Sequence, residues 1–283
     1  MMQVFDTRPC QLGEGPLWHP LRQQLFWFDI LGKRLMTQTE QDGPADWSFG
    51  EQVSAAGWID RDTLLIASET RLFTFNLITQ TSRNVAPLEA GRRDTRSNDG
   101  RADPWGGFWI GTMGKNAEAG AGAIYRYYKG ALRQLHDAIT VPNAICFAPL
   151  SPLAYFTDTE TGQVMRQRLD PATGWPIGQA ELFLDLTGEG LKPDGAVVDT
   201  DGRIWIALWG SGRVAAYTPE GQFDQAISLD ATHSTCPAFG GADLSTLFCT
   251  SALMGLIETG RFDGLTFSTA VQAKGQAEHQ VIL

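Results

Sequence analysis

The sequence predicts an all-β protein, a six-bladed β-propeller in which each blade is a four-stranded antiparallel sheet. A short apolar segment with an aromatic or branched residue at its centre recurs six times, and each copy follows a turn. The centres lie 38, 44, 46, 50 and 43 residues apart. That spacing matches the period of roughly 40–50 residues typical of a propeller blade. The six central residues are Trp27, Leu65, Trp109, Tyr155, Trp205 and Phe248.

The segments around these centres predict the other strands of each blade. Asp, Pro and Gly precede the copies, for example at 60–62, 103–106 and 199–202, so each copy forms a hairpin with an inner strand before it. Residues 183–186 are typical of an outermost strand. A third strand is expected about eight residues after each centre, a spacing that suits hairpin-connected strands. The predicted third strands are 34–37, 71–75, 123–127, 163–167, 213–217 and 255–258.

The repeat runs from end to end, so a single propeller domain over residues 1–283 is expected. No long apolar pattern with a 3.6-residue period occurs, which predicts few or no helices. A first strand near residues 3–7 is expected to pair with the last blade and close the ring, because closure removes an exposed sheet edge.

Composition restricts the possible partners and compartments. The 22 Lys and Arg against 32 Asp and Glu give a net charge of −10, which argues against a nucleic-acid partner. No stretch approaches 18 apolar residues and no secretory signal opens the chain, so a cytoplasmic protein without a membrane partner is expected. The four cysteines form no C-x-x-C pair and are expected to be buried free thiols.

The inner strand of each blade should line the central channel. The mouth end of each inner strand should lie 11–13 residues before the blade centre, and four of the six residues there are acids or amides. Two carboxylates and two carboxamides around one axis are the oxygen ligands of a hard divalent cation, although each residue alone would also suit a turn. The six ring residues are Glu14, Ser54, Asn98, Asn143, Asp194 and Cys236.

Two further residues are candidates for contact with a substrate. Arg96 lies two residues before Asn98, so in a strand both face the same side, where the guanidinium could hold a substrate hydroxyl or carboxylate. An ion pair at the rim is the alternative for Arg96. Glu118 lies in a Gly- and Ala-rich loop of the third blade, where a solvated acid is the alternative. No G-x-S-x-G, H-E-x-x-H or EF-hand motif occurs.

Five short motifs spread over nearly the whole chain point to a known family. They are GEGPLW at 13–18, RSNDG at 96–100, GTM at 111–113, PNA at 142–144 and PDG at 193–195. In this order and spacing they resemble the SMP-30/gluconolactonase/regucalcin family. The resemblance implies a six-bladed propeller and a lactonase that acts on sugar lactones with one divalent metal ion, whether Ca²⁺, Zn²⁺, Mn²⁺, Mg²⁺ or Fe²⁺.

The same resemblance implies residue roles. Metal ligands match Glu14, Asn143 and Asp194, while substrate contacts match Arg96, Asn98 and Glu118. We therefore expect hydrolysis of an aldonolactone to its sugar acid, with Asp194 as both metal ligand and general base. A non-enzymatic calcium-binding or regulatory propeller is the main alternative. A glycosidase that uses a carboxylate pair is a third, less suited to the two amides. The identity of the sugar and the oligomeric state stay open.

Overall fold

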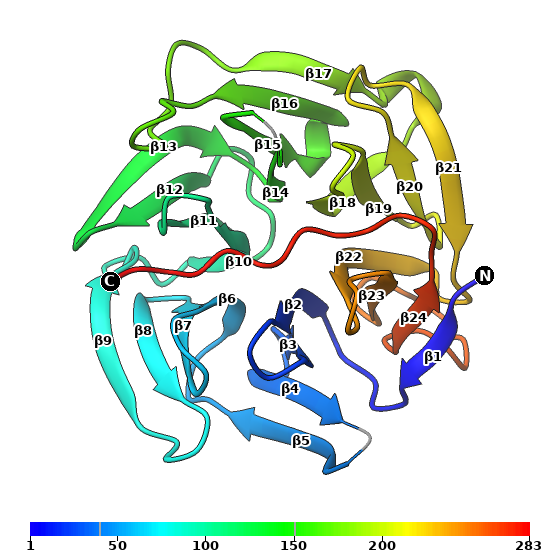
Figure 1. Cartoon of the computed structure of the whole chain (residues 1–283), viewed down its shortest axis with the longest axis horizontal. Coiled ribbons are helices and arrows are strands. Elements are labelled where there is room, and N and C mark those ends of the chain that lie inside the picture. The colour runs from blue at the N-terminus through cyan, green and yellow to red at the C-terminus, as the bar shows by residue number, and fades with distance from the viewer. Residues whose placement is uncertain (40, 150) are drawn as a thin grey trace.

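A computed structural model describes residues 1–39, 41–149 and 151–283 of the chain. Over these residues the chain forms six four-stranded antiparallel sheets arranged around one central axis (Figure 1). In five of the sheets the strand nearest the axis comes first in the chain and the next strands follow outward, whereas in the sixth the outermost strand is the N-terminal β1. The predicted six-bladed propeller is confirmed.

The strands of each blade are given from the axis outward. Blade 1 contains β2 (Gly13–His19), β3 (Gln24–Asp29), β4 (Arg34–Thr39) and β5 (Gly43–Ser48). Blade 2 contains β6 (Val53–Trp58), β7 (Thr63–Ser68), β8 (Arg71–Asn76) and β9 (Ser82–Pro87). Blade 3 contains β10 (Thr95–Ala102), β11 (Phe108–Gly114), β12 (Gly122–Tyr128) and β13 (Ala131–Ile139). Blade 4 contains β14 (Pro142–Phe147), β15 (Leu153–Asp158), β16 (Gln163–Arg168) and β17 (Glu181–Asp185). Blade 5 contains β18 (Lys192–Val198), β19 (Ile204–Trp209), β20 (Arg213–Tyr217) and β21 (Phe223–Ser228). Blade 6 contains β22 (His233–Gly240), β23 (Thr246–Ala252), β24 (Thr266–Ala270) and β1 (Gln3–Asp6).

The repeated aromatic residues form the core between neighbouring blades. Trp27, Trp109 and Trp205 lie in the second strands of their blades and are fully buried. Trp109 meets Phe147 of the next blade edge to face, with ring centroids 5.5 Å apart. Such large buried rings supply much of the apolar area that holds twisted sheets together. The motif that revealed the repeat therefore also joins its copies.

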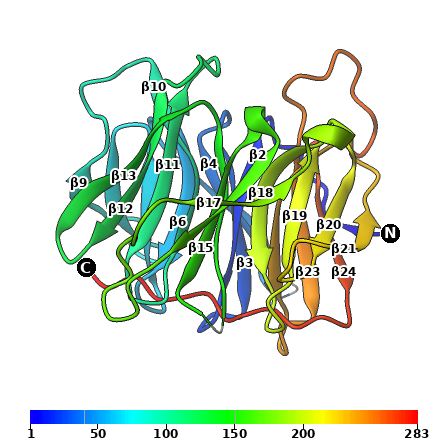
Figure 2. The ribbon, with the colours of Figure 1, turned by 90° about the horizontal axis from the view of Figure 1, so that it is seen from above.

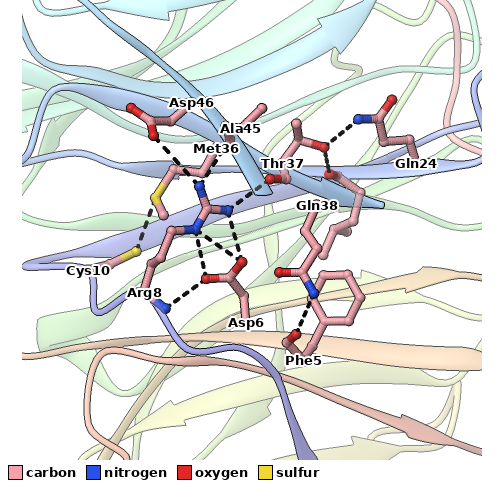
Figure 3. Close-up of polar contacts among 11 residues, drawn as sticks. Phe5, Asp6, Arg8, Cys10, Gln24, Met36, Thr37, Gln38, Ala45 and Asp46 are labelled. Atoms are coloured by element: carbon pink, nitrogen blue, oxygen red, sulfur yellow. Dashed lines mark hydrogen bonds and ion pairs between the residues drawn. The ribbon is translucent and has the colours of Figure 1, made fainter. Parts of the chain in front are cut away.

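The ring closes through the N-terminal strand, as the sequence predicts. β1 pairs antiparallel with β24, and Gln3 lies opposite Ser268. Beyond β1, Arg8 pairs with Asp6 at 2.9 Å and donates from Nη2 to the Thr37 carbonyl of blade 1 at 2.8 Å (Figure 3). The N-terminal segment therefore joins blade 6 to blade 1.

One predicted strand is wrong. The third strand of blade 6 is β24. Residues 255–258, predicted for it, form a turn and bends in the loop before β24. Gly255 has φ +85°, a left-handed conformation that breaks a strand, and the Ile257 side chain is fully exposed. The apolar residues at 255–258 resemble a strand in sequence. The strand in the structure is β24, which pairs with β23 on one side and with β1 on the other.

Short helices and the C-terminal tail complete the fold. Two single-turn 3₁₀ helices occur among the described residues, η1 (Thr159–Thr161) and η2 (Thr187–Glu189), so the expectation of few helices is confirmed. After β24 the chain crosses the end of the propeller at which the inner strands finish (Figures 1 and 2). No helix in the part of the chain described is long and apolar enough to cross a membrane.

The tail is fixed to four blades by specific contacts. Gln276 donates through Nε2 to the carbonyls of Val198 and Phe147, in blades 5 and 4. The Glu278 carboxylate forms an ion pair with Arg101 of blade 3 in which both side chains are nearly buried. Val281 donates from its backbone N to the Trp58 carbonyl of blade 2 at 2.9 Å. The inner strands therefore run from the candidate site at one end to this tail at the other.

Candidate functional site

Each inner strand carries an irregularity in its pairing with the second strand, and each irregularity includes the residue expected to face the axis. Such bulges bend a strand and re-aim one side chain, and they are common beside active sites. At Gly15 the bulge requires φ +54° and leaves no room for a Cβ, which would lie 2.2 Å from the Ser54 carbonyl oxygen. The register shifts lie between Glu14 and Leu17, Val53 and Ala55, Ser97 and Gly100, Asn143 and Cys146, Pro193 and Ala196, and Ser234 and Pro237.

Five of the six predicted site residues line one cavity at the mouth of the channel. It has a volume of about 190 Å³. Each of the five is at most 5% exposed, so their polar groups converge in a nearly buried space. The five are Glu14, Arg96, Asn98, Asn143 and Asp194.

The walls around this polar floor differ in character. Leu12, Trp209 and Met254 supply apolar surface on the side of blades 5, 6 and 1. Glu160 and Lys192 form an ion pair at 3.0 Å, and both side chains are about half exposed. The cavity thus has an apolar wall, a charged rim and a floor of oxygen-bearing side chains, a combination that suits a polyhydroxylated small molecule.

Hydrogen bonds connect the floor residues across two blades. Arg96 donates from Nη1 to Asn98 Oδ1 at 2.7 Å. Asn98 donates from Nδ2 to Asn143 Oδ1 at 2.9 Å and to the Pro142 carbonyl at 3.0 Å. Asn143 donates from Nδ2 to Thr159 Oγ1 at 2.8 Å. The two amides are therefore held in one continuous network.

Burial and like charge dominate the electrostatics of the two acids. Burial raises the pKa of Glu14 to about 8; the Asp99 charge adds to the rise, while the Gly15 amide and Arg96 oppose it. Burial, followed by the charge of Glu14, raises the pKa of Asp194 well above its ordinary value. Burial also lowers the pKa of Arg96 to about 10 against the attraction of both acids. The site therefore favours the uptake of further positive charge.

The donor set consists of oxygen. In the described parts of the chain, no group of three or more His, Cys, Asp or Glu side chains is placed to hold a metal. The cavity instead offers two carboxylates, from Glu14 and Asp194, and the amide oxygen of Asn143. Carboxylate and amide oxygens suit a hard divalent cation, and so few protein ligands leave positions for water and substrate. The residues present therefore fit one such ion.

Glu118 is the predicted site residue that does not line the cavity. Its carboxylate accepts hydrogen bonds from the backbone N of Asn116 at 3.1 Å and from Asn116 Nδ2 at 2.9 Å, and the residue is exposed. Its neighbour Ala117 reaches the cavity instead. Contact between Glu118 and a substrate stays a prediction.

Sequence reasoning missed several residues at this site. Thr159 and Glu160 follow the second strand of blade 4, outside the inner strands that the repeat singled out. Asp99, which the sequence did not single out, is buried and accepts from the Ile145 amide at 2.7 Å. Its place directly after Asn98 in the RSNDG motif could have pointed to Asp99. No feature of the sequence pointed to Thr159, because its contact with Asn143 arises only from the packing of η1.

The four cysteines agree with the sequence expectation. Cys10, Cys146, Cys236 and Cys249 are all free and buried. Burial raises the pKa of the Cys236 thiol well above its ordinary value. These thiols therefore behave as small core residues and supply no thiolate ligand to the cavity.

Known proteins share both the sequence and the fold. The family described as SMP-30/Gluconolactonase/LRE-like region matches residues 12–253. A Rhizobium meliloti protein named as a candidate sugar lactone lactonase is 40% identical, over 98% of this chain and 95% of its own length. A 6-deoxy-6-sulfogluconolactonase of Pseudomonas putida is 32% identical, over 98% of this chain and 97% of its own.

Among solved structures, a calcium-binding protein from Agrobacterium tumefaciens, named regucalcin, is 38% identical. It superposes with a TM-score of 0.96 and covers 100% of this chain and 98% of its own. The resemblance expected from the five motifs is therefore confirmed. The chain belongs to the SMP-30/gluconolactonase family.

Proposed function

We propose that the protein is a hydrolase of carboxylic esters that opens a sugar lactone to its sugar acid with the help of one divalent metal ion. The observation that carries this proposal is the convergence of Glu14, Asn143 and Asp194 with Arg96 in one nearly buried cavity. The relatives named as lactonases support the same reaction. A sugar acid is a product typical of carbohydrate catabolism, which is the role we propose.

Three residues would hold the metal. Glu14 and Asp194 would supply carboxylate oxygens and Asn143 its amide oxygen, and the cation would offset the repulsion that raises the pKa of both acids. A divalent ion bound there supplies Lewis acidity at the lactone carbonyl. The oxygen-only donor set favours Ca²⁺, Mg²⁺ or Mn²⁺, with Zn²⁺ and Fe²⁺ as further candidates.

Side chains of the cavity would transfer the proton and bind the substrate. Asp194 takes a proton from the attacking water as that water bonds to the carbonyl carbon. When the ring C–O bond breaks, Asp194 returns this proton to the leaving ring oxygen, which gives a hydroxyl and a carboxylic acid. Arg96 and Asn98 bind substrate hydroxyls and hold the ring against Asp194, which contributes through proximity and orientation. Glu118 is proposed as a further substrate contact on the blade 3 loop.

A lactone panel with metal exchange tests the proposal. The protein is stripped with EDTA and reloaded with each of the five metals, and acid release from pentono- and hexonolactones is followed with a pH indicator. We expect release above the spontaneous rate only in the reloaded samples. Tight metal binding without turnover of any lactone would instead favour a calcium-binding propeller without enzymatic activity, for which the similarity to the calcium-binding regucalcin structure speaks.

A further inference from the structure

The usefulness of Asn143 to a cation depends on which way its amide is turned. A carboxamide has an oxygen that accepts and an NH₂ group that only donates, and only the oxygen can bind a cation. The two ends have nearly the same shape, so packing alone does not distinguish them. Something beside Asn143 must therefore fix the choice.

The carbonyl of Pro193 fixes it through Thr159. The Thr159 Oγ1 lies 2.7 Å from the Pro193 carbonyl oxygen, which can only accept, so the hydroxyl proton must point there. Thr159 Oγ1 is then left as an acceptor toward Asn143. The atom of Asn143 that faces it at 2.8 Å must be the NH₂ group.

The oxygen end of the amide then faces Asn98, which lines the cavity together with Asn143. Asn143 Oδ1 accepts from Asn98 Nδ2 at 2.9 Å and keeps a second lone pair. Asn98 is oriented by the same rule, because its NH₂ group also donates to the Pro142 carbonyl at 3.0 Å. One backbone carbonyl on each side thus sets the direction of the whole chain of amides.

The turn that carries Thr159 is itself fixed to the strand that carries Asn143. The carboxylate of Asp158, directly before Thr159, accepts from the backbone N of Thr140 at 2.8 Å and of Val141 at 3.0 Å. Thr159 is 6% exposed and Asn143 2%. Water therefore has little access to replace a lost partner, and an unpaired NH₂ group there would be costly.

We propose that Thr159 is a positioning residue for the metal site, acting through the amide orientation of Asn143. This inference rests on the proposed metal site. Removal of the hydroxyl takes away one of the two partners that set the amide orientation and leaves the Asn143 NH₂ group without an acceptor, so the amide is no longer held on that side with its oxygen toward the cation. Changes to such outer partners typically weaken metal affinity about 10- to 100-fold.

Three variants test the proposal by calorimetric titration with CaCl₂, MnCl₂ and ZnCl₂, alongside thermal unfolding without metal. Thr159→Val removes the hydroxyl at nearly constant shape, and Thr159→Ser keeps it. Thr37→Val is the matched control. The Thr37 Oγ1 also accepts from a side-chain amide, Gln24 Nε2 at 2.7 Å, and donates to a carbonyl, that of Leu25 at 2.6 Å, in blade 1 (Figure 3).

We expect Thr159→Val to weaken binding of the best-bound metal about 10- to 100-fold, and Thr159→Ser to stay within about threefold of wild type. Thr37→Val should lose similar thermal stability and keep wild-type affinity. Metal affinity of Thr159→Val within about threefold of wild type, or an equal loss in Thr37→Val, overturns the proposal. If the valine variant does not fold, Thr159→Ala carries the same expectations. A wild type that binds none of the three metals overturns the metal site itself, which is a separate failure.

Discussion

Asn98 donates a hydrogen bond of 2.9 Å from Nδ2 to Oδ1 of Asn143, and this bond joins the inner strands of blades 3 and 4 at the floor of the cavity. Asn98 also accepts from Arg96, so it lies between the proposed substrate-binding cation and the proposed metal ligand. The two halves of the site are therefore mechanically connected through one side chain.

Asn98→Ala should damage both halves together. The change removes the donor to Asn143 and the acceptor of Arg96, so we expect kcat/KM to fall at least ~10-fold and metal affinity to weaken by a similar factor. Steady-state kinetics and metal titration measure the two effects. A variant that loses neither would show that the amide network does not support the site.

Asp194→Asn should separate binding from chemistry. The amide keeps an oxygen for the metal but cannot accept a proton, so the fold should persist while kcat falls at least ~10²-fold. Circular dichroism and single-turnover kinetics on the metal-loaded variant check this. Near wild-type turnover with bound metal would remove Asp194 from the role of general base.

Stability of the metal-free protein should depend on pH through the paired acids. The folded-state pKa of Glu14, about 8, lies above its ordinary value of 4.5. The unfolded chain therefore releases this proton first as pH rises, and the contribution to stability is present below about pH 4.5 and lost by about pH 8. A bound cation removes this loss by favouring the charged forms.

The measurable quantity is the difference in Tm between metal-loaded and EDTA-treated protein. We expect it to grow from pH 5 to pH 8 by at least about 2 °C, the smallest shift that about 1 kcal/mol gives in a domain of this size. Glu14→Gln should flatten the trend, because one of the two acids is gone. A difference that stays constant over this range in wild type contradicts the interpretation.

The ion pair between Glu160 and Lys192 at the rim should affect substrate binding and contribute little to folding stability. Both side chains are about half exposed, and such surface pairs contribute about 0–1 kcal/mol to folding. Lys192→Met should raise KM by about 5-fold for lactones whose hydroxyls reach the rim, the effect of about one hydrogen bond, with kcat unchanged. Lys274→Met, on the exposed tail, is the control. Equal KM values in the two variants would exclude a substrate contact.

A buried ion pair that does not line the cavity should matter to stability and not to substrate binding. Arg126 Nε and Asp103 Oδ2 lie 2.6 Å apart with both side chains fully buried, and the guanidinium stacks over Tyr128 and Trp175. Asp103→Asn leaves an uncompensated charge, so urea unfolding should show a loss of about 3–5 kcal/mol. The folded fraction should retain wild-type KM. A change in KM would mean that this pair communicates with the site.

The sequence predicted the blade period, the ring of inner-strand residues and five residues of the floor, because each depends on local repetition. It did not predict Thr159 or Glu160 at the cavity. The position of Thr159 at the cavity depends on how η1 packs against Asn143. No repeated sequence pattern links these two residues, so their contact could not be predicted. The third strand of blade 6 was misplaced because the apolar residues at 255–258 resemble a strand, whereas the outer partner of the actual strand, β1, is remote in the chain.

The C-terminal tail has a kinetic consequence. Gln276 and Glu278 hold it across the end of the channel where the inner strands finish, and one cavity between the tail and blades 3 to 5 has a volume of about 20 Å³, large enough for a water molecule. A lactone or a sugar acid is much larger than this cavity. We therefore expect substrate and product to use the same mouth of the channel, so product inhibition should be competitive, which initial rates at several product concentrations would measure.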